Sequence, residues 1–209
     1  MAYIGTQPNN VKKNIGLYNP NEILQLTKEG SWGGSMELIQ SQTVSSPVAQ
    51  VDFTSIKESK YDVHLLTWVD VVSANDSKRM VLRFFESGTI ETASVYQYAN
   101  QVNYAGNIYT EAKSTGDNDI RINDNTGNDT AENQNGYVYC YNLGNSSKYS
   151  YTNCMSVGVA STNINWSEFG GGVLPQASTV DGIRLLIDGD YNITAGTLKL
   201  YGVKQIWVT

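Results

Sequence analysis

The stretch GIRLLIDGDYNITAGTLKLYGV, residues 182–203, holds two runs of strand-like sequence near the end of the chain. The runs 183–187 and 197–201 are rich in alternating apolar side chains, and a polar loop containing Gly189 separates them. Two such runs around a polar, glycine-containing loop are typical of an antiparallel strand pair. The stretch therefore predicts a closing β-hairpin.

Similar strand signals recur upstream, from Gly34 onward, at roughly the 8 to 12 residue spacing of a sandwich or barrel. Strands are expected near residues 35–40, 49–56, 61–72, 80–86, 94–99, 107–112, 119–122, 136–143, 154–160, 183–187 and 197–207. Only 16% of the residues are charged, whereas Gly (19) and Tyr (14) are abundant and Pro (4) is scarce. This balance favours strands and turns over amphipathic helices. The 209 residues predict one all-β domain, an antiparallel β sandwich over residues 34–209.

Two of these segments have distinct faces. In YDVHLLTWVDVV, residues 61–72, one face is apolar; it consists of Tyr61, Val63, Leu65, Thr67, Val69 and Val71. In GYVYCYNL, residues 136–143, Tyr137, Tyr139 and Tyr141 share one face and apolar side chains share the other. A strand that is sticky on both faces is central in its sheet, or is an edge covered by another chain. We interpret the tyrosine face as a candidate subunit contact.

Glycine and asparagine mark two further stretches. Residues 114–136 are dominated by Asn, Asp, Gly and Thr, which predicts a loop, a short strand and a second loop, with Ile120 and Ile122 pointing inward. Asn135-Gly136 predicts a turn. The run FGGGVLP, residues 169–175, lacks the Lys-Ser/Thr of a phosphate-binding loop and is interpreted as a flexible connection.

The first 33 residues differ from the rest, because they show no alternation and contain two of the four prolines. Only NPNEILQLTKEG, residues 19–30, predicts a short helix, with Asn19 or Asn21 as its N-cap and Gly30 as its stop signal. The segment 1–33 is therefore expected to lack a core of its own, and to pack on a partner or along the domain surface.

Charge and hydropathy exclude two classes of partner. A net charge of −6 and an isoelectric point near 4.7 oppose nucleic-acid binding, which needs clustered Lys and Arg. The sequence contains no apolar run of about 20 residues, so we expect no membrane insertion. The N-terminus also lacks the basic and apolar layout of a secretion signal.

Catalytic and metal-binding patterns are absent from the sequence. His64 is the single histidine, and its place in a strand favours a structural or surface role over nucleophilic catalysis. The carboxylates that a glycosidase would need, at Glu86, Glu91, Glu111, Asp119 and Glu168, are scattered. We therefore predict a protein that is not an enzyme and has no cofactor.

Two stretches of the sequence are rich in the side-chain oxygens that bind calcium. The loop that begins at Asp188 departs from an EF-hand at Ile193 and Lys199, where that motif requires glycine and glutamate. A second oxygen-rich stretch contains Asp117, Asp119, Asp124 and Asp129; whether it binds calcium is left open, because Asp is also common in turns.

The two cysteines of the sequence are too few for a disulfide framework. Cys140 and Cys154 are the only two cysteines and both lie in strand-like runs. The sequence favours buried free thiols. A disulfide bond remains the alternative if adjacent strands bring the two sulfurs together.

Aromatic and polar residues in or beside loops are the candidate contact residues. Exposed aromatics stack on sugars or make rigid contacts with a protein partner. The candidates are Tyr104, Tyr149, Tyr151, Trp166, Asp188, Tyr191 and Asn192. The alternative is a tyrosine-rich sandwich whose hydroxyls face water.

Four segments carry a family resemblance. They are MAYIGTQP (1–8), LQLTKEGSWGGSMELIQSQTVSSPVAQVDFTSI (24–56), LRFFESG (82–88) and DGIRLLIDGDYNITAGTLKLYGV (181–203). Together they resemble virion structural proteins of tailed bacteriophages, especially marine phages of cyanobacteria and related hosts. The resemblance implies a jelly-roll-like sandwich displayed as a tail-fibre head or capsid decoration, assembled in the host cytoplasm.

The resemblance also implies how the chain is divided. The N-terminal segment would attach to other virion proteins; its candidate attachment residues are Tyr3, Ile4, Pro8, Ile15 and Tyr18. The closing strand would pair near the first strands and seal a sheet edge, which leaves the loop 188–195 at one tip of the domain.

Displayed modules of this kind are commonly homotrimers, and a host-surface glycan or protein is the expected target. Two alternatives remain from other classes of function: a depolymerase that cuts host polysaccharide, and a carbohydrate-binding module outside any virus.

Overall fold

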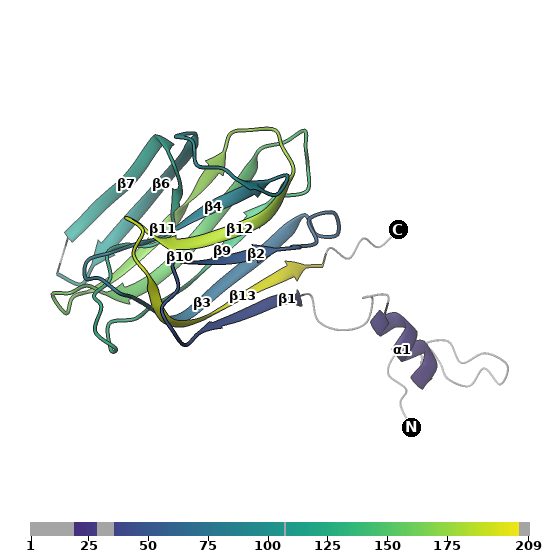
Figure 1. Cartoon of the computed structure of the whole chain (residues 1–209), viewed down its shortest axis with the longest axis horizontal. Helices are drawn as coiled ribbons and strands as arrows, with labels where there is room; N and C mark the ends of the chain where they lie inside the picture. Colours follow the sequence, from purple (N-terminus) through teal and green to yellow (C-terminus); the bar gives the residue numbers. More distant parts are fainter. Residues whose placement is uncertain (1–18, 29–35, 107, 205–209) are drawn as a thin grey trace, which may run out of the picture. The chain divides into compact units, whose positions relative to one another are not determined.

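A computed structural model describes residues 19–28, 36–106 and 108–204. The chain divides into two compact units, residues 1–35 and 36–209, each described by itself below. The second unit is built from strands (Figure 1). They are β1 (Met36–Val44), β2 (Gln50–Thr54), β3 (Val63–Ser73), β4 (Met80–Glu86), β5 (Thr89–Ile90), β6 (Tyr96–Tyr104), β7 (Ile108–Asp117), β8 (Ile120–Arg121), β9 (Gln134–Tyr141), β10 (Ser150–Val159), β11 (Asn165–Leu174), β12 (Val180–Ile187) and β13 (Ile193–Val203).

The first unit contains helix α1 (Pro20–Lys28). Asn19 Oδ1 accepts a hydrogen bond from the backbone N–H of Glu22 (2.9 Å), and Glu22 Oε2 accepts one from the backbone N–H of Asn19 (2.7 Å). These reciprocal bonds form a capping box. Asn19 is thus the N-cap, as predicted. The predicted stop at Gly30 and the attachment residues Tyr3, Ile4, Pro8, Ile15 and Tyr18 lie outside the described residues.

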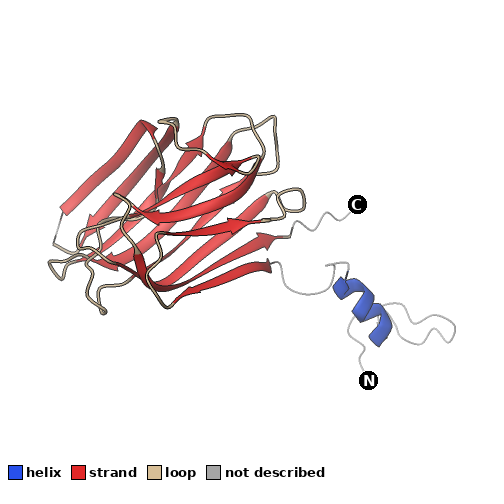
Figure 2. Cartoon of the chain, in the orientation of Figure 1, coloured by secondary structure: helices blue, strands red, loops and turns tan. Residues whose placement is uncertain are grey.

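The strands form two antiparallel sheets, which confirms the predicted all-β sandwich (Figure 2). The larger sheet has eight strands in the order β1-β13-β3-β9-β10-β11-β6-β7, so β1 and β7 are its edges. The smaller sheet has the order β2-β12-β4-β5, and β8 pairs with β4. Strand β9 lies inside the larger sheet, between β3 and β10, so the central alternative for the tyrosine-bearing segment is confirmed.

The predicted closing hairpin is wrong, because β12 and β13 belong to different sheets. Strand β12 pairs with β2 and β4, whereas β13 pairs with β1 and β3. Each strand buries an apolar row, such as Ile183 and Leu185 on β12 and Leu198 and Leu200 on β13. Rows of this kind face each other across a sandwich core. The last strand does join the first strands, as expected, but β1 and not β13 forms the edge.

The face of β3 that packs in the core is also opposite to the predicted one. His64, Leu66 and Trp68 are fully buried, while Val69 on the predicted apolar face is exposed. The strand then changes face at Asp70, which has a φ of 55° and lies where the pairing with β9 shifts register. Bulges of this kind interrupt the alternation from which a face is read.

Gly136 explains why the predicted Asn135-Gly136 turn is absent. Both residues lie within β9, where Gly136 is the register partner of Trp68. An added Cβ at Gly136 would lie 2.5 Å from Trp68 Cζ2 and 2.7 Å from the carbonyl oxygen of Met155. The glycine therefore makes room for an indole ring instead of reversing the chain.

The run FGGGV is likewise part of a strand, β11, and not a flexible connection. An added Cβ at Gly170 would lie 2.3 Å from Asn100 Oδ1, and one at Gly172 would lie 2.6 Å from Ile120 Cγ2. These two glycines let neighbouring side chains approach the strand closely on its core side. Ile120 and Ile122 are fully buried, as predicted.

Candidate functional site

One face of the larger sheet carries exposed apolar side chains, and we call it the outer face. The buried residues of the same strands alternate with the exposed ones, so the opposite face packs in the core. The largest exposed side chains on β9, β10 and β11 are those of Tyr137, Tyr151, Met155, Val157 and Phe169. Surface apolar groups gathered in this way mark sites of interaction.

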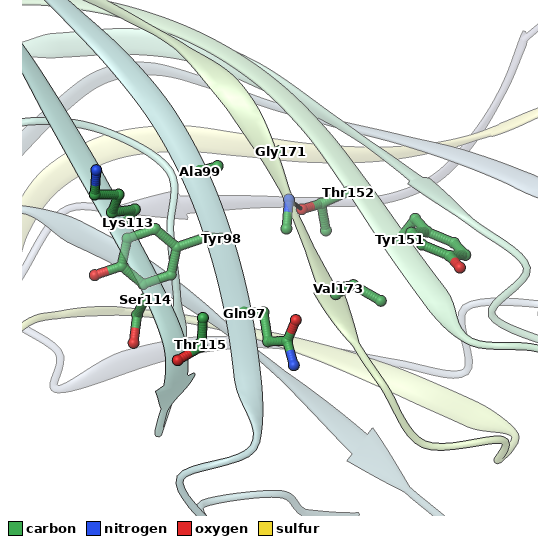
Figure 3. A pocket seen from close by; sticks show the side chains of 11 residues that line it. Gln97, Tyr98, Ala99, Lys113, Ser114, Thr115, Tyr151, Thr152, Gly171 and Val173 are labelled. Carbon is green, nitrogen blue, oxygen red and sulfur yellow. Dashed lines mark hydrogen bonds between the residues drawn. The ribbon is translucent and has the colours of Figure 1, made fainter.

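A groove of about 860 Å³ crosses the outer face over β10, β11, β6 and β7 (Figure 3). Its floor follows one row of the sheet, in which Asn153, Gly171, Ala99 and Lys113 are successive register partners. Gly171 and Ala99, in the middle of this row, have little or no side chain. Their small size leaves a trough between larger neighbours.

Each side of the trough has one exposed aromatic ring. Tyr151 lies in the row on one side, with Val173 as its register partner on β11. Phe169 lies in the row on the other side and lines a second hollow of about 370 Å³, which shares Ala99 and Lys113 with the groove. Tyr151 is 45% exposed and Phe169 is 49% exposed, so both rings are open to a ligand.

The polar groups of the groove are mainly uncharged. Among the described residues, the side chains of Gln97, Thr115 and Tyr151 have no hydrogen-bond partner in the protein. Lys113 is the one charged residue lining the groove, and its Nζ lies 2.6 Å from Glu111 Oε2. The groove therefore offers free neutral hydrogen-bonding groups and no unpaired charge.

The predicted contact residues do not form one site. Tyr151 lines the groove, and Tyr149 is exposed but does not line it. Trp166 is fully buried, so its prediction as an exposed contact residue is wrong. It lies on the core side of β11 against Gly158, where an added Cβ would lie 2.6 Å from the indole. Tyr104 is half-buried and its hydroxyl donates to Asp124.

The other three predicted contacts lie in the loop between β12 and β13. Asp188 pairs with Arg79 (3.2 Å), and Lys78 Nζ lies 4.3 Å from the centre of the Tyr191 ring. Asn192 is exposed. None of these residues lines the groove.

Most groove residues were not identified from the sequence. The only sequence feature that marks the groove is the glycine run of β11, which its sequence predicted to be a flexible connection. The other floor and wall residues, such as Gln97, Ala99 and Lys113, come from two strands whose register no local pattern reveals.

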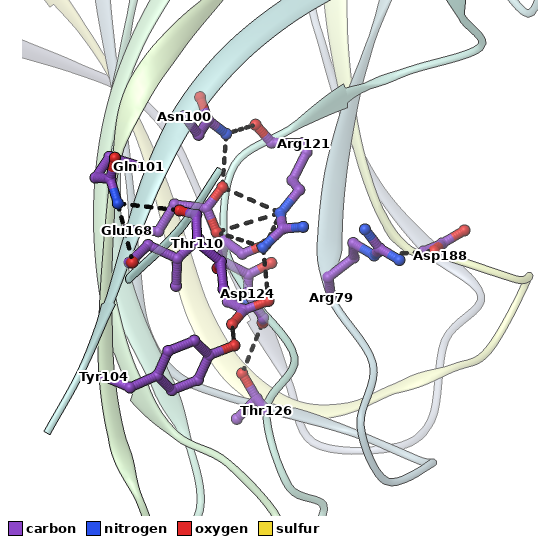
Figure 4. A network of polar contacts seen from close by, with 12 residues as sticks. Arg79, Asn100, Gln101, Tyr104, Thr110, Arg121, Asp124, Thr126, Glu168 and Asp188 are labelled. Atoms are coloured by element: carbon purple, nitrogen blue, oxygen red, sulfur yellow. Dashed lines mark hydrogen bonds and ion pairs between the residues drawn. The ribbon is translucent and has the colours of Figure 1, made fainter. Parts of the chain in front are cut away.

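A separate cluster of polar side chains is buried on the core side of the larger sheet (Figure 4). Arg121 Nη2 lies 2.6 Å from Asp124 Oδ1, and Arg121 Nε lies 3.1 Å from Glu168 Oε1. Asn100 Nδ2 also donates to Glu168 (2.6 Å). Burial raises the pKa of Glu168 against the opposing effect of Arg121. Glu168, one of the acids considered for glycoside hydrolysis, is therefore inaccessible and already partnered.

The histidine and both cysteines are also buried. Nε2 of His64 lies 2.9 Å from the carbonyl oxygen of Ile56, and burial lowers the pKa of the imidazole. Cys140 and Cys154 are free and buried, as favoured from the sequence. Burial raises the pKa of both thiols, that of Cys154 to about 12. Such thiols are poor nucleophiles, because the thiolate is the reactive form.

Asp119 provides a test of pH dependence. Burial raises the pKa of this carboxyl from 3.8 to about 6, although Arg83 Nη2 lies 3.3 Å away and opposes the shift. The folded state binds this proton more tightly than the unfolded state does. Proton binding therefore stabilises the fold fully below the pKa of the unfolded state, and this stabilisation is lost as pH rises through about 6. Between pH 4 and pH 7 this carboxyl should lower the free energy of unfolding by an amount on the order of 2 kcal/mol.

The Asp119→Asn variant lacks this titration. Urea unfolding gives the free energy of unfolding of both proteins at pH 4 and pH 7. From pH 4 to pH 7 this free energy should fall further for the original protein than for the variant. Parallel pH profiles would show that the folded-state pKa of Asp119 is not raised.

The described residues contain neither a metal site of His, Cys, Asp or Glu side chains nor a helix that could cross a membrane. No group of three or more His, Cys, Asp or Glu among residues 19–28, 36–106 and 108–204 is arranged to hold a metal ion. Within the same residues, α1 is the only helix, and it is too short to cross a membrane.

The fold and the groove define the class of this protein, an antiparallel two-sheet β sandwich with an open, neutral groove on its larger sheet. Comparison with protein-family models, curated proteins and solved structures gives no match. Its function is therefore inferred from the site and from the sequence.

Proposed function

We propose that the protein is a non-enzymatic structural component of a tailed-phage virion, displayed as a tail-fibre head or capsid decoration. The observation that carries the proposal is the outer face, where a groove and exposed apolar side chains are presented on a rigid sheet. The N-terminal segment, residues 1–33, would attach to other virion proteins. The sandwich would contact the host surface or neighbouring subunits, and we propose that it is a jelly roll.

The buried acids favour display over catalysis. A glycosidase places two carboxyl groups on either side of an accessible sugar bond. Here Glu168 and Asp124 both bind Arg121, and both carboxylates are buried. If the alternative were correct and the protein were a depolymerase, replacing the candidate carboxylates one at a time (Glu86, Glu91, Glu111, Asp119 and Glu168) would reveal one whose loss abolishes cleavage of a host polysaccharide.

Self-association is part of the proposal. Tyr137, Tyr139 and Tyr141 form a row on the outer face of β9, with the rings of Tyr137 and Tyr139 5.8 Å apart. Exposed aromatics on a rigid strand suit a symmetric contact, and a closed trimer would repeat one small patch three times.

Particle incorporation tests the display role. We expect tagged full-length protein to be incorporated into phage particles and to be visible by immunogold electron microscopy, and tagged residues 34–209 to be excluded. Circular dichroism of the truncated protein should show a folded β domain, since the sandwich unit begins at Met36. Equal incorporation of both proteins would contradict an attachment role for residues 1–33, whereas incorporation of neither protein would favour the stand-alone carbohydrate-binding module.

A further inference from the structure

We infer that the groove on the outer face binds a neutral polysaccharide chain. The inference deepens the proposed display function and rests on it for the biological setting. The expected occupant is a sugar polymer without ionised groups, because the shape, the aromatic rings and the charge of the groove all fit that chemistry.

The shape of the groove suits a segment of a polymer. The groove and the adjoining hollow share Ala99 and Lys113, so the depression continues along the strands, towards Gln101 and Phe169, beyond one binding position. Its volume of about 860 Å³ lies in the upper part of the range of about 300 to 1,000 Å³ that ligand pockets occupy. An open trough of this size accepts several sugar units and lets the chain leave at either end.

The aromatic rings suit the apolar faces of sugars. Tyr151 and Phe169 are exposed on opposite sides of the Gly171 and Ala99 floor. A pyranose ring carries C–H groups that pack on an aromatic face, while its hydroxyls remain free for hydrogen bonds. The small size of Gly171 and Ala99 lets the sugar ring approach the sheet between these two aromatic residues.

The polar groups and the charge select a neutral chain. Gln97, Thr115 and the Tyr151 hydroxyl both donate and accept hydrogen bonds, as sugar hydroxyls do, and within the described chain they have no partner. Lys113 Nζ lies 2.6 Å from Glu111 Oε2, so these two exposed charges together add no net charge to the groove. The net charge of −6 repels an acidic polysaccharide at long range.

Affinity electrophoresis of the full-length protein tests this inference. The probes are neutral polysaccharides (dextran, laminarin and galactomannan) and acidic ones (alginate and hyaluronan), each cast in a native gel. We expect at least one neutral probe to retard the protein. Tyr151→Ala and Ala99→Leu should each weaken this binding about tenfold or more, because one removes a stacking ring and the other fills the trough.

Tyr149→Ala is the matched control, because Tyr149 is also 45% exposed but does not line the groove. Its affinity should stay within about twofold of the original. The inference is overturned if no neutral probe binds, if only acidic probes bind, or if both groove variants bind normally. It is also overturned if Ala99→Leu changes the oligomeric state in sedimentation, which would make the groove a subunit contact.

Failure of this inference can be told apart from failure of the proposed function. The groove variants retain residues 1–33, so they should be incorporated into particles like the original protein. If the protein is incorporated normally but binds no neutral polysaccharide, only the proposed ligand is rejected. Failure of the attachment role would instead appear as normal incorporation of the truncated protein.

Discussion

Replacing Trp166 by alanine is expected to lower the free energy of unfolding by about 3–5 kcal/mol. The indole is fully buried on the core side of β11 and packs against Gly158. Alanine would leave a cavity that the rigid strands cannot fill, so the protein would lose both the burial of the ring and its packing contacts. Urea unfolding followed by circular dichroism measures the loss.

Phe169→Ala is the control for this change, because Phe169 lies on the same strand but on the outer face, where it is 49% exposed. Its removal should cost about 1 kcal/mol or less, in proportion to the smaller area that it buries. If Trp166→Ala cost no more than Phe169→Ala, Trp166 would be a surface residue and the assignment of core and outer faces on β11 would be wrong.

Replacing Arg121 by methionine should be equally damaging, with a loss of about 3–5 kcal/mol. The guanidinium group is the shared partner of Asp124 and Glu168, and both carboxylates are buried. Methionine fills similar space without the charge, so two buried acids would be left without a cationic partner. The cost comes mainly from that desolvation and not from lost attraction.

Arg79→Met is the matched control. Arg79 pairs with Asp188, but their side chains are 34% and 48% exposed, so water screens the pair. An exposed ion pair of this kind contributes about 0–1 kcal/mol. Differential scanning calorimetry of the two variants at neutral pH should therefore show a large drop in Tm for Arg121→Met alone. Equal drops would indicate that the Arg121 cluster is open to solvent.

The periodicity of the sequence predicted the local elements well where alternation was uninterrupted. The segment 80–86 coincides with β4, and the helix capped by Asn19 is present as α1. The failures have physical causes. At Asp70 a bulge reversed the alternation of β3, and in β11 the glycines that make room for neighbouring side chains resembled chain breakers.

The candidate site was harder to predict than the strands. Tyr151 was identified because it is aromatic and lies beside a polar loop, and it does line the groove. Trp166 met the same criterion but is buried, since its side of β11 faces the core. Aromatic character alone therefore does not reveal exposure. The floor at Ala99 and Gly171 has no chemical signal, because it is defined by the small size of these two residues.

By itself, the sequence determined an acidic all-β protein with a capped N-terminal helix and free, buried cysteines, because these properties depend on composition and on local spacing. Only the tertiary structure decided which sheet each strand joins and which face of each strand is buried. Strands β12 and β13 show why, since their similar apolar rows would suit a hairpin as well as two facing sheets. Packing across the whole core selects between the two arrangements, and that packing depends on residues far apart in the sequence.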